Sequence, residues 1–267
     1  MSETRTRPDL VVTAYDAGAP TYAELWSPML VPAGQALLDA LPLAAARVVV
    51  DLGVGTGAMV PALRRAAPEA AVVGVDLSIG MLREARRRTG VPVALMSLDR
   101  PALRAASADA AVMCFVLFHL PDPGATLAAV HRTLRPGGVF GCSTWGPRQP
   151  FAPDVVWQGL IDAADGGAPG TTRCDDGLDH PDALAARLRA AGFSRVTAWT
   201  SEVSQRFSVE NFLTVRTASG SLGLRFSRLG PAKQQALVAQ AREQLAELAD
   251  DQWTMRDEAV LATGRRD

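Results

Sequence analysis

The stretch Arg47-Val-Val-Val-Asp-Leu-Gly-Val-Gly-Thr-Gly-Ala-Met59 decides the fold of this chain. Its three consecutive valines, Val48 to Val50, are β-branched and predict a strand that is buried on both faces. Three glycines follow at alternate positions, and a helical pattern then begins near Ala58 and ends around Pro68. A strand, a glycine-rich turn and a helix in this order are typical of the first unit of a nucleotide-binding α/β domain.

The turn contains Gly53, Gly55 and Gly57. Without a Cβ atom, glycines allow a tight turn and let a ligand lie directly on the backbone. The helix that follows presents unpaired N–H groups and a partial positive charge, which suit a carboxylate or phosphate. We therefore predict a ligand site at this turn. The alternative is a tight strand-to-helix turn that binds nothing.

Composition excludes several classes of protein. The chain has 267 residues, 48% hydrophobic and 21% charged, with a net charge of −1, so its bulk charge does not indicate a nucleic-acid or membrane-surface binder. Its three cysteines, Cys114, Cys142 and Cys174, are scattered and form neither a disulfide framework nor a C-x-x-C metal site. No signal peptide opens the chain, and no apolar run reaches transmembrane length. We expect a cytoplasmic protein without a metal, from a GC-rich bacterial genome.

Strand and helix patterns alternate along most of the chain, which predicts a doubly wound parallel sheet with helices on both faces. We read residues 1–267 as one domain with added cap elements at about 10–41, 145–180 and 208–250. The expected strands are 48–50, 70–76, 91–96, 109–119, 139–144, 195–200 and 258–264, and the expected helices begin near 58, 78, 127, 181, 212 and 231.

The first cap segment, 10–41, has a helical pattern that Pro20, Pro28 and Pro32 are expected to break. It contains both tyrosines of the chain, Tyr15 and Tyr22. Two interpretations stay open: the segment covers the ligand site, or it packs on the edge of the sheet.

The segment 145–180 is rich in proline and glycine and is expected to be an irregular insertion past the carboxyl end of a strand, where substrate pockets form. The segment combines apolar residues with the charged residues Arg148, Asp154 and Arg173. This combination suits an aromatic or polyketide-like small molecule.

Acidic residues follow the next two strands. Asp76 ends the second strand, where a carboxylate is placed to accept hydrogen bonds from ribose hydroxyls. Ser78 is a candidate cap for the next helix. Met81, in the first turn of that helix, offers a polarizable thioether beside an adenine ring. Asp99 lies in a loop, where its carboxylate could accept a hydrogen bond from the adenine amino group. Aspartates are common in loops, so this assignment is less specific than that of Asp76.

Taken together, these motifs resemble those of class I S-adenosylmethionine-dependent methyltransferases. The resemblance rests on Asp51–Gly57, on Asp76–Leu82, on Asp99 and on Leu134-Arg-Pro-Gly-Gly138, and it covers the chain from about Tyr15. It implies a Rossmann-like sheet of seven strands, six parallel and the last antiparallel. The subgroup is similar to the small-molecule enzymes of the ubiquinone/menaquinone C-methyltransferase type. That subgroup methylates carbon, nitrogen and oxygen, so the acceptor stays open.

The resemblance also implies S-adenosylmethionine as the cofactor and a contact for each matching position. Gly53, Gly55 and Gly57 would lie against its methionine part, where Asp51 would orient the amino group and Tyr22 would touch the carboxylate. Asp76 would bind the ribose. Leu77 and Met81 would flank the adenine, and Leu98 and Asp99 would meet the adenine edge.

Methyl transfer is an in-line displacement at an activated sulfonium, so the protein mainly supplies alignment. A general base is needed only where the acceptor must lose a proton early. His119, at the carboxyl end of the fourth strand, is the candidate base, and the alternative is a structural histidine. We expect a small-molecule acceptor and a monomer or homodimer.

Two rival functions stay open. A nicotinamide oxidoreductase shares the strand, glycine turn and second acid, but here the glycines follow G-x-G-x-G and an acid precedes them. The other rival is a cofactor-binding protein of the same fold that does not methylate, for instance one that catalyses a cyclisation.

Overall fold

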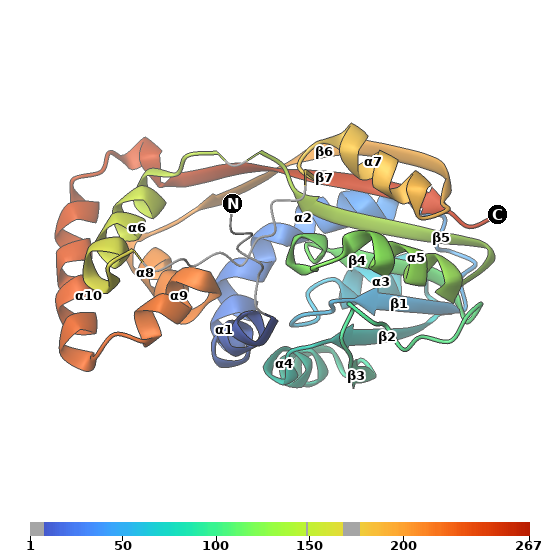
Figure 1. Cartoon of the computed structure of the whole chain (residues 1–267), viewed down its shortest axis with the longest axis horizontal. Helices are drawn as coiled ribbons and strands as arrows, with labels where there is room; N and C mark the ends of the chain where they lie inside the picture. Colours follow the sequence, from blue (N-terminus) through green and yellow to red (C-terminus); the bar gives the residue numbers. More distant parts are fainter. Residues whose placement is uncertain (1–7, 148, 168–176) are drawn as a thin grey trace.

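The computed structural model describes residues 8–147, 149–167 and 177–267. Its strands are β1 (Val48–Leu52), β2 (Ala71–Asp76), β3 (Val93–Leu95), β4 (Ala108–Cys114), β5 (Leu134–Trp145), β6 (Ser194–Arg206) and β7 (Thr254–Arg265). They form a seven-stranded sheet in the order β3-β2-β1-β4-β5-β7-β6 (Figure 1). β7 runs antiparallel to its neighbours β5 and β6, and the other pairs are parallel. The predicted sheet is therefore confirmed.

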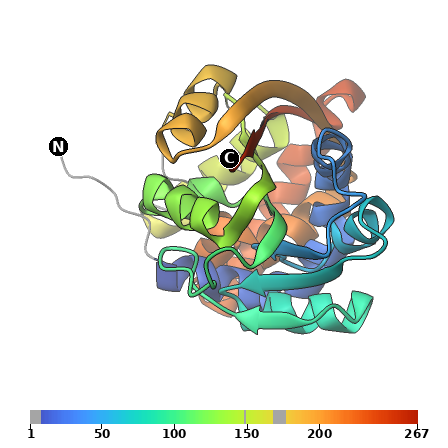
Figure 2. The same cartoon turned by 90° about the vertical axis from the view of Figure 1, so that its right-hand side faces the viewer.

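Helices cover both faces of this sheet. On one face, α2 (Ser27–Asp39), α3 (Val60–Ala66) and α4 (Ile79–Thr89) share a buried cluster with Val49. On the other, α5 (Pro123–Thr133) and α7 (Pro181–Ala190) share a cluster with Val50. Figure 2 shows α5 in green and α7 in gold, next to each other. Successive residues of a strand point to opposite faces, so a strand covered on both sides is apolar throughout.

The strands β6 and β7 extend past the rest of the sheet as a two-stranded ribbon. β5 pairs with β7 as far as Trp145 and Ala259, whereas β6 and β7 stay paired to Arg206 and Thr254. Beyond β5 lies a helical group, at the left of Figure 1, of α6 (Ala152–Asp165), α8 (Val209–Ala218), α9 (Gly220–Ser227) and α10 (Pro231–Ala246). A third buried cluster, with Trp157 of α6 among its members, joins this group to α2 and to the ribbon.

The prolines of the N-terminal segment do not break it as predicted. Pro20 lies inside α1 (Pro8–Thr21) and Pro32 inside α2, while Pro28 occupies the first turn of α2. A π-helical turn, η1 (Tyr22–Trp26), joins the two helices directly after Pro20. A proline removes one backbone hydrogen bond, and α2 offsets that loss by burying one face on the sheet.

The prediction that residues 145–180 are irregular is wrong for their central part, which is the 14-residue helix α6. Its proline, Pro153, lies in the first turn, where a missing N–H costs little. Gly166 ends the helix in the left-handed conformation, with φ of 76°. Pro153 and Gly166 therefore mark the two ends of a helix, whereas the prediction interpreted them as signs of a loop. Arg148 and Arg173 lie outside the described residues.

Other boundaries differ in instructive ways. β5, β6 and β7 are longer than predicted because β7 pairs with both of its neighbours. The helix expected from 212 is instead two helices, α8 and α9, which are separated at Ser219, whose backbone is extended. Ser78 caps α4 as predicted, and Ser208 caps α8; each accepts a hydrogen bond from a backbone N–H three residues on. Two 3₁₀ turns, η2 (Leu117–His119) and η3 (Asp250–Trp253), complete the described elements.

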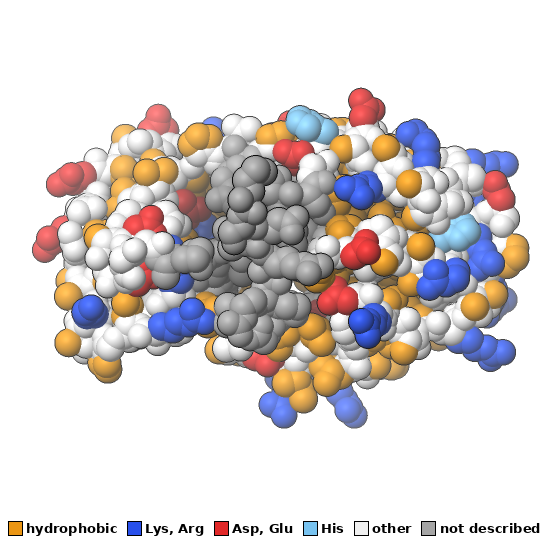
Figure 3. Space-filling view, viewed as in Figure 1, with side chains coloured by type: hydrophobic (Ala, Val, Ile, Leu, Met, Phe, Trp, Pro, Cys, Tyr) orange, Lys and Arg blue, Asp and Glu red, His pale blue; other side chains and the backbone are white. Residues whose placement is uncertain are grey.

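Surface charge is mixed. On the face shown in Figure 3, acidic and basic side chains are interspersed, in keeping with the net charge of −1. Within the described ranges, no helix combines the length and the apolar character that crossing a bilayer requires.

Candidate active site

The glycines of the turn after β1 have different surroundings: some pack against other residues, and some border a cavity. Gly53, Gly55 and Gly57 all have positive φ, at 78°, 53° and 80°. A Cβ on Gly53 would lie 2.3 Å from Val116, and one on Gly57 would lie 3.1 Å from Thr89 of α4. A Cβ on Gly55 would meet open space, with its nearest neighbour 4.0 Å away. Gly53 and Gly55 line a cavity, whereas Gly57 packs against α4.

Asp76, at the carboxyl end of β2, ties the turn to α4. One of its carboxylate oxygens accepts a hydrogen bond from the Gly55 N–H and the other from the Ser78 N–H, both at 2.9 Å. Burial raises the pKa of Asp76, and these backbone donors oppose the rise. Each carboxylate oxygen can accept a second hydrogen bond, so the group can still meet ligand hydroxyls.

Asp51 lies on β1 at the floor of a smaller cavity that Tyr22, Gly53 and Gly55 also line. Its side chain is almost fully buried. Burial, reinforced by the charge of Asp76, raises the pKa of Asp51 to about 7. A carboxylate held in this way gains from a cationic partner such as a ligand ammonium group.

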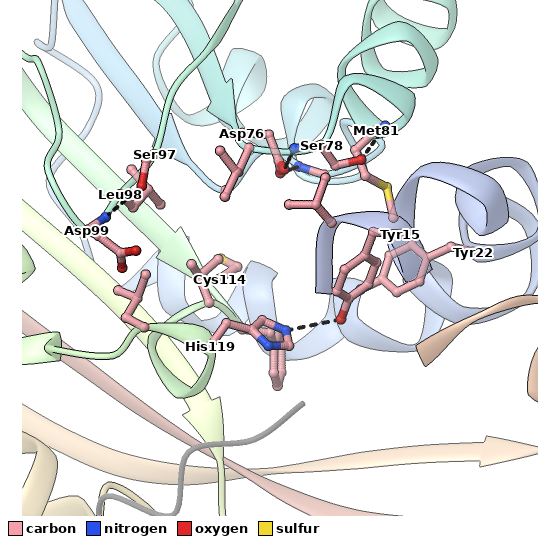
Figure 4. Close-up of a pocket in the computed structure, with 17 residues that line it drawn as sticks. Tyr15, Tyr22, Asp76, Ser78, Met81, Ser97, Leu98, Asp99, Cys114 and His119 are labelled. Atoms are coloured by element: carbon pink, nitrogen blue, oxygen red, sulfur yellow. Dashed lines mark hydrogen bonds between the residues drawn. The ribbon is translucent and has the colours of Figure 1, made fainter. Parts of the chain in front are cut away.

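The opposite side of the pocket carries Leu98 and Asp99, in the loop after β3 (Figure 4). The Oδ1 atom of Asp99 is buried and has no hydrogen-bond partner among the described residues. Buried polar atoms in native proteins are almost always hydrogen-bonded, so an orphaned acceptor that faces a pocket marks the place of a ligand donor. Leu77 and Met81 line the same pocket from the α4 side.

These residues line two neighbouring cavities. A pocket of about 140 Å³ and a smaller one of about 60 Å³ share Tyr22, Gly53, Gly55, Cys114 and Phe115. The larger is lined by nine of the predicted site residues: Tyr22, Gly53, Gly55, Asp76, Leu77, Met81, Leu98, Asp99 and His119. We call the two together the cofactor pocket. In the described part of the chain, no group of three or more His, Cys, Asp or Glu side chains is arranged to hold a metal ion.

A third and larger cavity, of about 620 Å³, adjoins the cofactor pocket, and we call it the chamber. It shares Tyr15, Tyr22, Phe115 and His119 with the pocket. Sequence reasoning missed Phe115, which has a left-handed backbone with φ of 57° and packs against Trp145 with ring centroids 4.7 Å apart. Such strained residues cluster at functional sites. Phe115 lies within a long apolar strand pattern, and nothing in the sequence distinguishes it from its apolar neighbours.

A hydrogen bond between Tyr15 and His119 stands where pocket and chamber meet. The Tyr15 hydroxyl lies 3.1 Å from His119 Nε2, and the two side chains point toward one another in Figure 4. The Tyr22 ring lies edge-on to Tyr15, with centroids 5.6 Å apart. Burial, with a further contribution from Asp76, raises the pKa of Tyr15, so it stays a neutral phenol at physiological pH. Sequence reasoning missed Tyr15, although its seven-residue spacing from Tyr22 was a signal of a shared helix face.

The N-terminal helices lie over the pocket, which supports the first of the two interpretations above. Asp16 of α1 accepts hydrogen bonds from the Ser78 hydroxyl at 2.6 Å and from the Gly80 N–H at 2.8 Å. A Cβ on Gly80 would lie 2.5 Å from the Asp16 carbonyl oxygen, so α1 approaches α4 very closely. This contact holds Tyr15 over the pocket.

Replacing Asp51 with Asn should make the ligand-free protein more stable at neutral to alkaline pH. Because the folded-state pKa of Asp51 is raised to about 7, the folded protein binds this proton more tightly than the unfolded chain. The free energy of unfolding therefore falls as the pH rises from about 4 to about 7. Asp51→Asn removes this loss, with an expected gain of about 1–3 kcal/mol above pH 7.

The measurement is thermal unfolding of both proteins at about pH 5 and about pH 8, where the stability gain of the Asn variant over the wild type should be larger at the higher pH. Parallel pH profiles for the two proteins would contradict the raised pKa.

Comparison with known proteins agrees with this geometry. A family model described as a methyltransferase domain matches residues 50–142. Trans-aconitate 2-methyltransferase of Methylobacterium nodulans is 33% identical over 190 residues, which are 70% of this chain and 69% of that one. Aklanonic acid methyltransferase of Streptomyces sp. strain C5 is 26% identical over 208 residues, covering 72% of this chain and 94% of that one.

Other matches are partial or structural. The matched part spans 39% of the length of the malonyl-[acyl-carrier protein] O-methyltransferase of Xylella fastidiosa and 34% of that of a Streptomyces fradiae transposon protein. Among solved structures, the [4+2]-cyclase SpnF superposes with a TM-score of 0.59 at 19% identity and covers 98% of both chains, which shows a shared fold. The match with the trans-aconitate enzyme covers more than two thirds of that protein, and it establishes the family. The chain belongs to the class I S-adenosylmethionine-dependent methyltransferases.

Proposed function

We propose that this protein transfers a methyl group from S-adenosylmethionine to a carbon, nitrogen or oxygen atom of a small molecule, of the size of a secondary metabolite. One observation carries the proposal: a cofactor pocket lined by exposed glycine backbone and by carboxylates shares four lining residues with an adjoining chamber of about 620 Å³. Ligand cavities for small molecules are commonly of about 300–1,000 Å³. The relatives named for trans-aconitate, aklanonic acid and demethylmenaquinone differ in acceptor, so kinship supports the reaction and leaves the acceptor open.

The described residues fit the cofactor along its whole length. The Asp51 carboxylate, whose burial is unfavourable without a partner, would hold the amino group of the methionine part, which lies over Gly53 and Gly55. Asp76 would hold the ribose hydroxyls with its remaining lone pairs. The Oδ1 atom of Asp99, which has no hydrogen-bond partner among the described residues, would accept a hydrogen bond from the adenine amino group. Leu77, Met81 and Leu98 would enclose the ring, and Tyr22 would meet the carboxylate end.

The bound cofactor supplies an activated methyl group on a sulfonium, and the chain's own contribution is alignment, which can contribute roughly 7–11 kcal/mol. Tyr15, Tyr22 and Phe115 line both spaces and would fix the line between methyl donor and acceptor. We propose that the segments 10–41, 145–180 and 208–250 act as a cap that excludes water. Their described helices α1, α2, α6 and α8 to α10 support this, since several of them line the chamber.

His119 is placed to take a proton from an acceptor. It borders both the pocket and the chamber, and its Nε2 is hydrogen-bonded to the neutral Tyr15 hydroxyl. This contact would orient the imidazole toward a group in the chamber, as base–orienter pairs do in other enzymes. We propose that His119 acts as the general base for acceptors that need one.

Binding of S-adenosylhomocysteine tests the cofactor. At about 100 times its dissociation constant, a ligand stabilises a protein by roughly 2.7 kcal/mol, so S-adenosylhomocysteine should raise the melting temperature and NADH should not. A rise with NADH alone would favour an oxidoreductase and overturn the proposal.

The reaction itself is tested by incubating the protein with isotope-labelled S-adenosylmethionine and a panel of candidate acceptors. We expect a product heavier by one methyl group. Conversion of an acceptor at unchanged mass would instead show a cyclase-like activity.

A further inference from the structure

The chamber has two unlike walls. Toward the cofactor pocket it is aromatic, with Tyr15, Tyr22 and Phe115 in its lining. The opposite wall is one face of α6, where Asp154, Gln158 and Asp162 follow one another at helical spacing and all line the chamber. An acceptor in the chamber therefore meets rings at one end and polar side chains at the other.

The two carboxylates of α6 have arginine partners. Arg216 binds Asp154 through two nitrogens, at 2.5 and 2.7 Å, and its guanidinium lies over the Trp26 ring, 4.8 Å from the centroid. Arg225 binds Asp162 at 2.7 Å and also binds Asp165 through two nitrogens, at 2.6 and 2.7 Å. Both guanidiniums are thus engaged by carboxylates.

The exposed fractions of the side chains show which member of each ion pair is the more accessible. The side chains of Arg216 and Arg225 are 12% and 5% exposed, whereas those of Asp154 and Asp162 are 35% and 45% exposed. Arg225 does not line the chamber and is packed behind Asp162, whereas Arg216 lines the chamber beside Asp154 but is less exposed than its partner. A carboxylate has about four lone-pair sites, of which these arginine contacts use a part. The wall therefore accepts hydrogen bonds more readily than it donates them.

The geometry points to an acceptor class: a ring-bearing molecule with a hydroxyl or amino group at the end remote from the cofactor, and without a free carboxylate there. This inference rests on the proposed function, which makes the chamber the acceptor site. A donor group would meet the oxygens of Asp154 and Asp162, while a carboxylate would face like charges at close range. Arg225 does not line the chamber, and Arg216 already binds Asp154 through Nε and Nη2.

Three probes with the same phenol ring separate these chemistries: tyramine carries an amine, tyrosol a hydroxyl and para-hydroxyphenylacetate a carboxylate. Their affinities are measured by ligand-observed NMR titration of protein that is saturated with S-adenosylhomocysteine. We expect tyramine and tyrosol to bind at least about fivefold more tightly than the acid. The ratio between the amine and the hydroxyl shows which donor is preferred.

Two variants assign the preference to α6. In Asp162→Asn, Arg225 keeps its contact with Asp165, so the fold should hold while the preference against the acid shrinks to about twofold or less. In Asp154→Asn, Arg216 loses its bidentate partner, and the acid should become the preferred probe. Glu243→Gln, on the exposed side of α10, removes the same charge and should change nothing. Circular dichroism confirms folding of each variant.

The outcomes are separable from those of the proposed function. Failure of S-adenosylhomocysteine to bind, measured by calorimetry before any probe is added, would count against the methyltransferase proposal. With that ligand bound, equal affinities for the three probes, tighter binding of the acid, absence of binding by all three, or a preference that persists in Asp162→Asn would each overturn the acceptor class.

Discussion

Gly55→Val should reduce the affinity for S-adenosylhomocysteine by more than about 100-fold, which corresponds to about 2.7 kcal/mol. A Cβ at Gly55 meets open space, and this glycine lines both parts of the cofactor pocket, so a valine side chain would occupy ligand volume. The left-handed backbone, with φ of 53°, also resists a β-branched residue. Isothermal titration calorimetry measures the loss directly.

The matched control is Gly90→Val. Gly90 ends α4, has φ of 66°, and a Cβ there would also meet open space, but this glycine lines neither the cofactor pocket nor the chamber. Both variants therefore carry a similar backbone strain, of the order of 1–2 kcal/mol in stability. Gly90→Val should bind the ligand within about twofold of the wild type. If both variants bind equally well, the ligand does not lie on the Gly55 backbone.

His119→Ala should lower the turnover number at least tenfold and leave the affinity for S-adenosylhomocysteine unchanged, once the acceptor screen has supplied a substrate that needs deprotonation. General-base catalysis typically contributes about 10²–10⁴-fold. His119 borders the chamber, so its loss should act on kcat more than on cofactor binding.

Two further variants separate a base from a merely structural histidine. Tyr15→Phe keeps the ring and removes the hydroxyl that contacts His119 at 3.1 Å, so kcat should fall by a smaller factor, about three- to tenfold, with the melting temperature preserved. His180→Ala replaces an exposed histidine that precedes α7 and should have no effect. Near-normal turnover in His119→Ala would leave alignment as the sole catalytic device.

The half of the site that binds the cofactor was accessible from sequence because it is built from strand ends. Asp51 and Asp76 lie at the carboxyl ends of β1 and β2, the glycine turn follows β1 directly, and parallel strands bring their carboxyl ends to one edge of the sheet. Tyr15 and His119 are 104 positions apart, and their contact depends on how α1 docks on α4 through Asp16. No periodicity in either segment records that docking.

The sequence by itself determined the sheet, the glycine turn and the carboxylates around it, because β-branched runs and glycines act on the backbone within a few residues. Tertiary structure alone decided the chamber. The prolines and glycines around α6 proved to be helix ends, and the carboxylates of α6 are paired with Arg216 of α8 and Arg225 of α9, which are distant in sequence. The physical reason is that a short helix takes its orientation from the apolar surfaces it buries, and those surfaces come from distant parts of the chain.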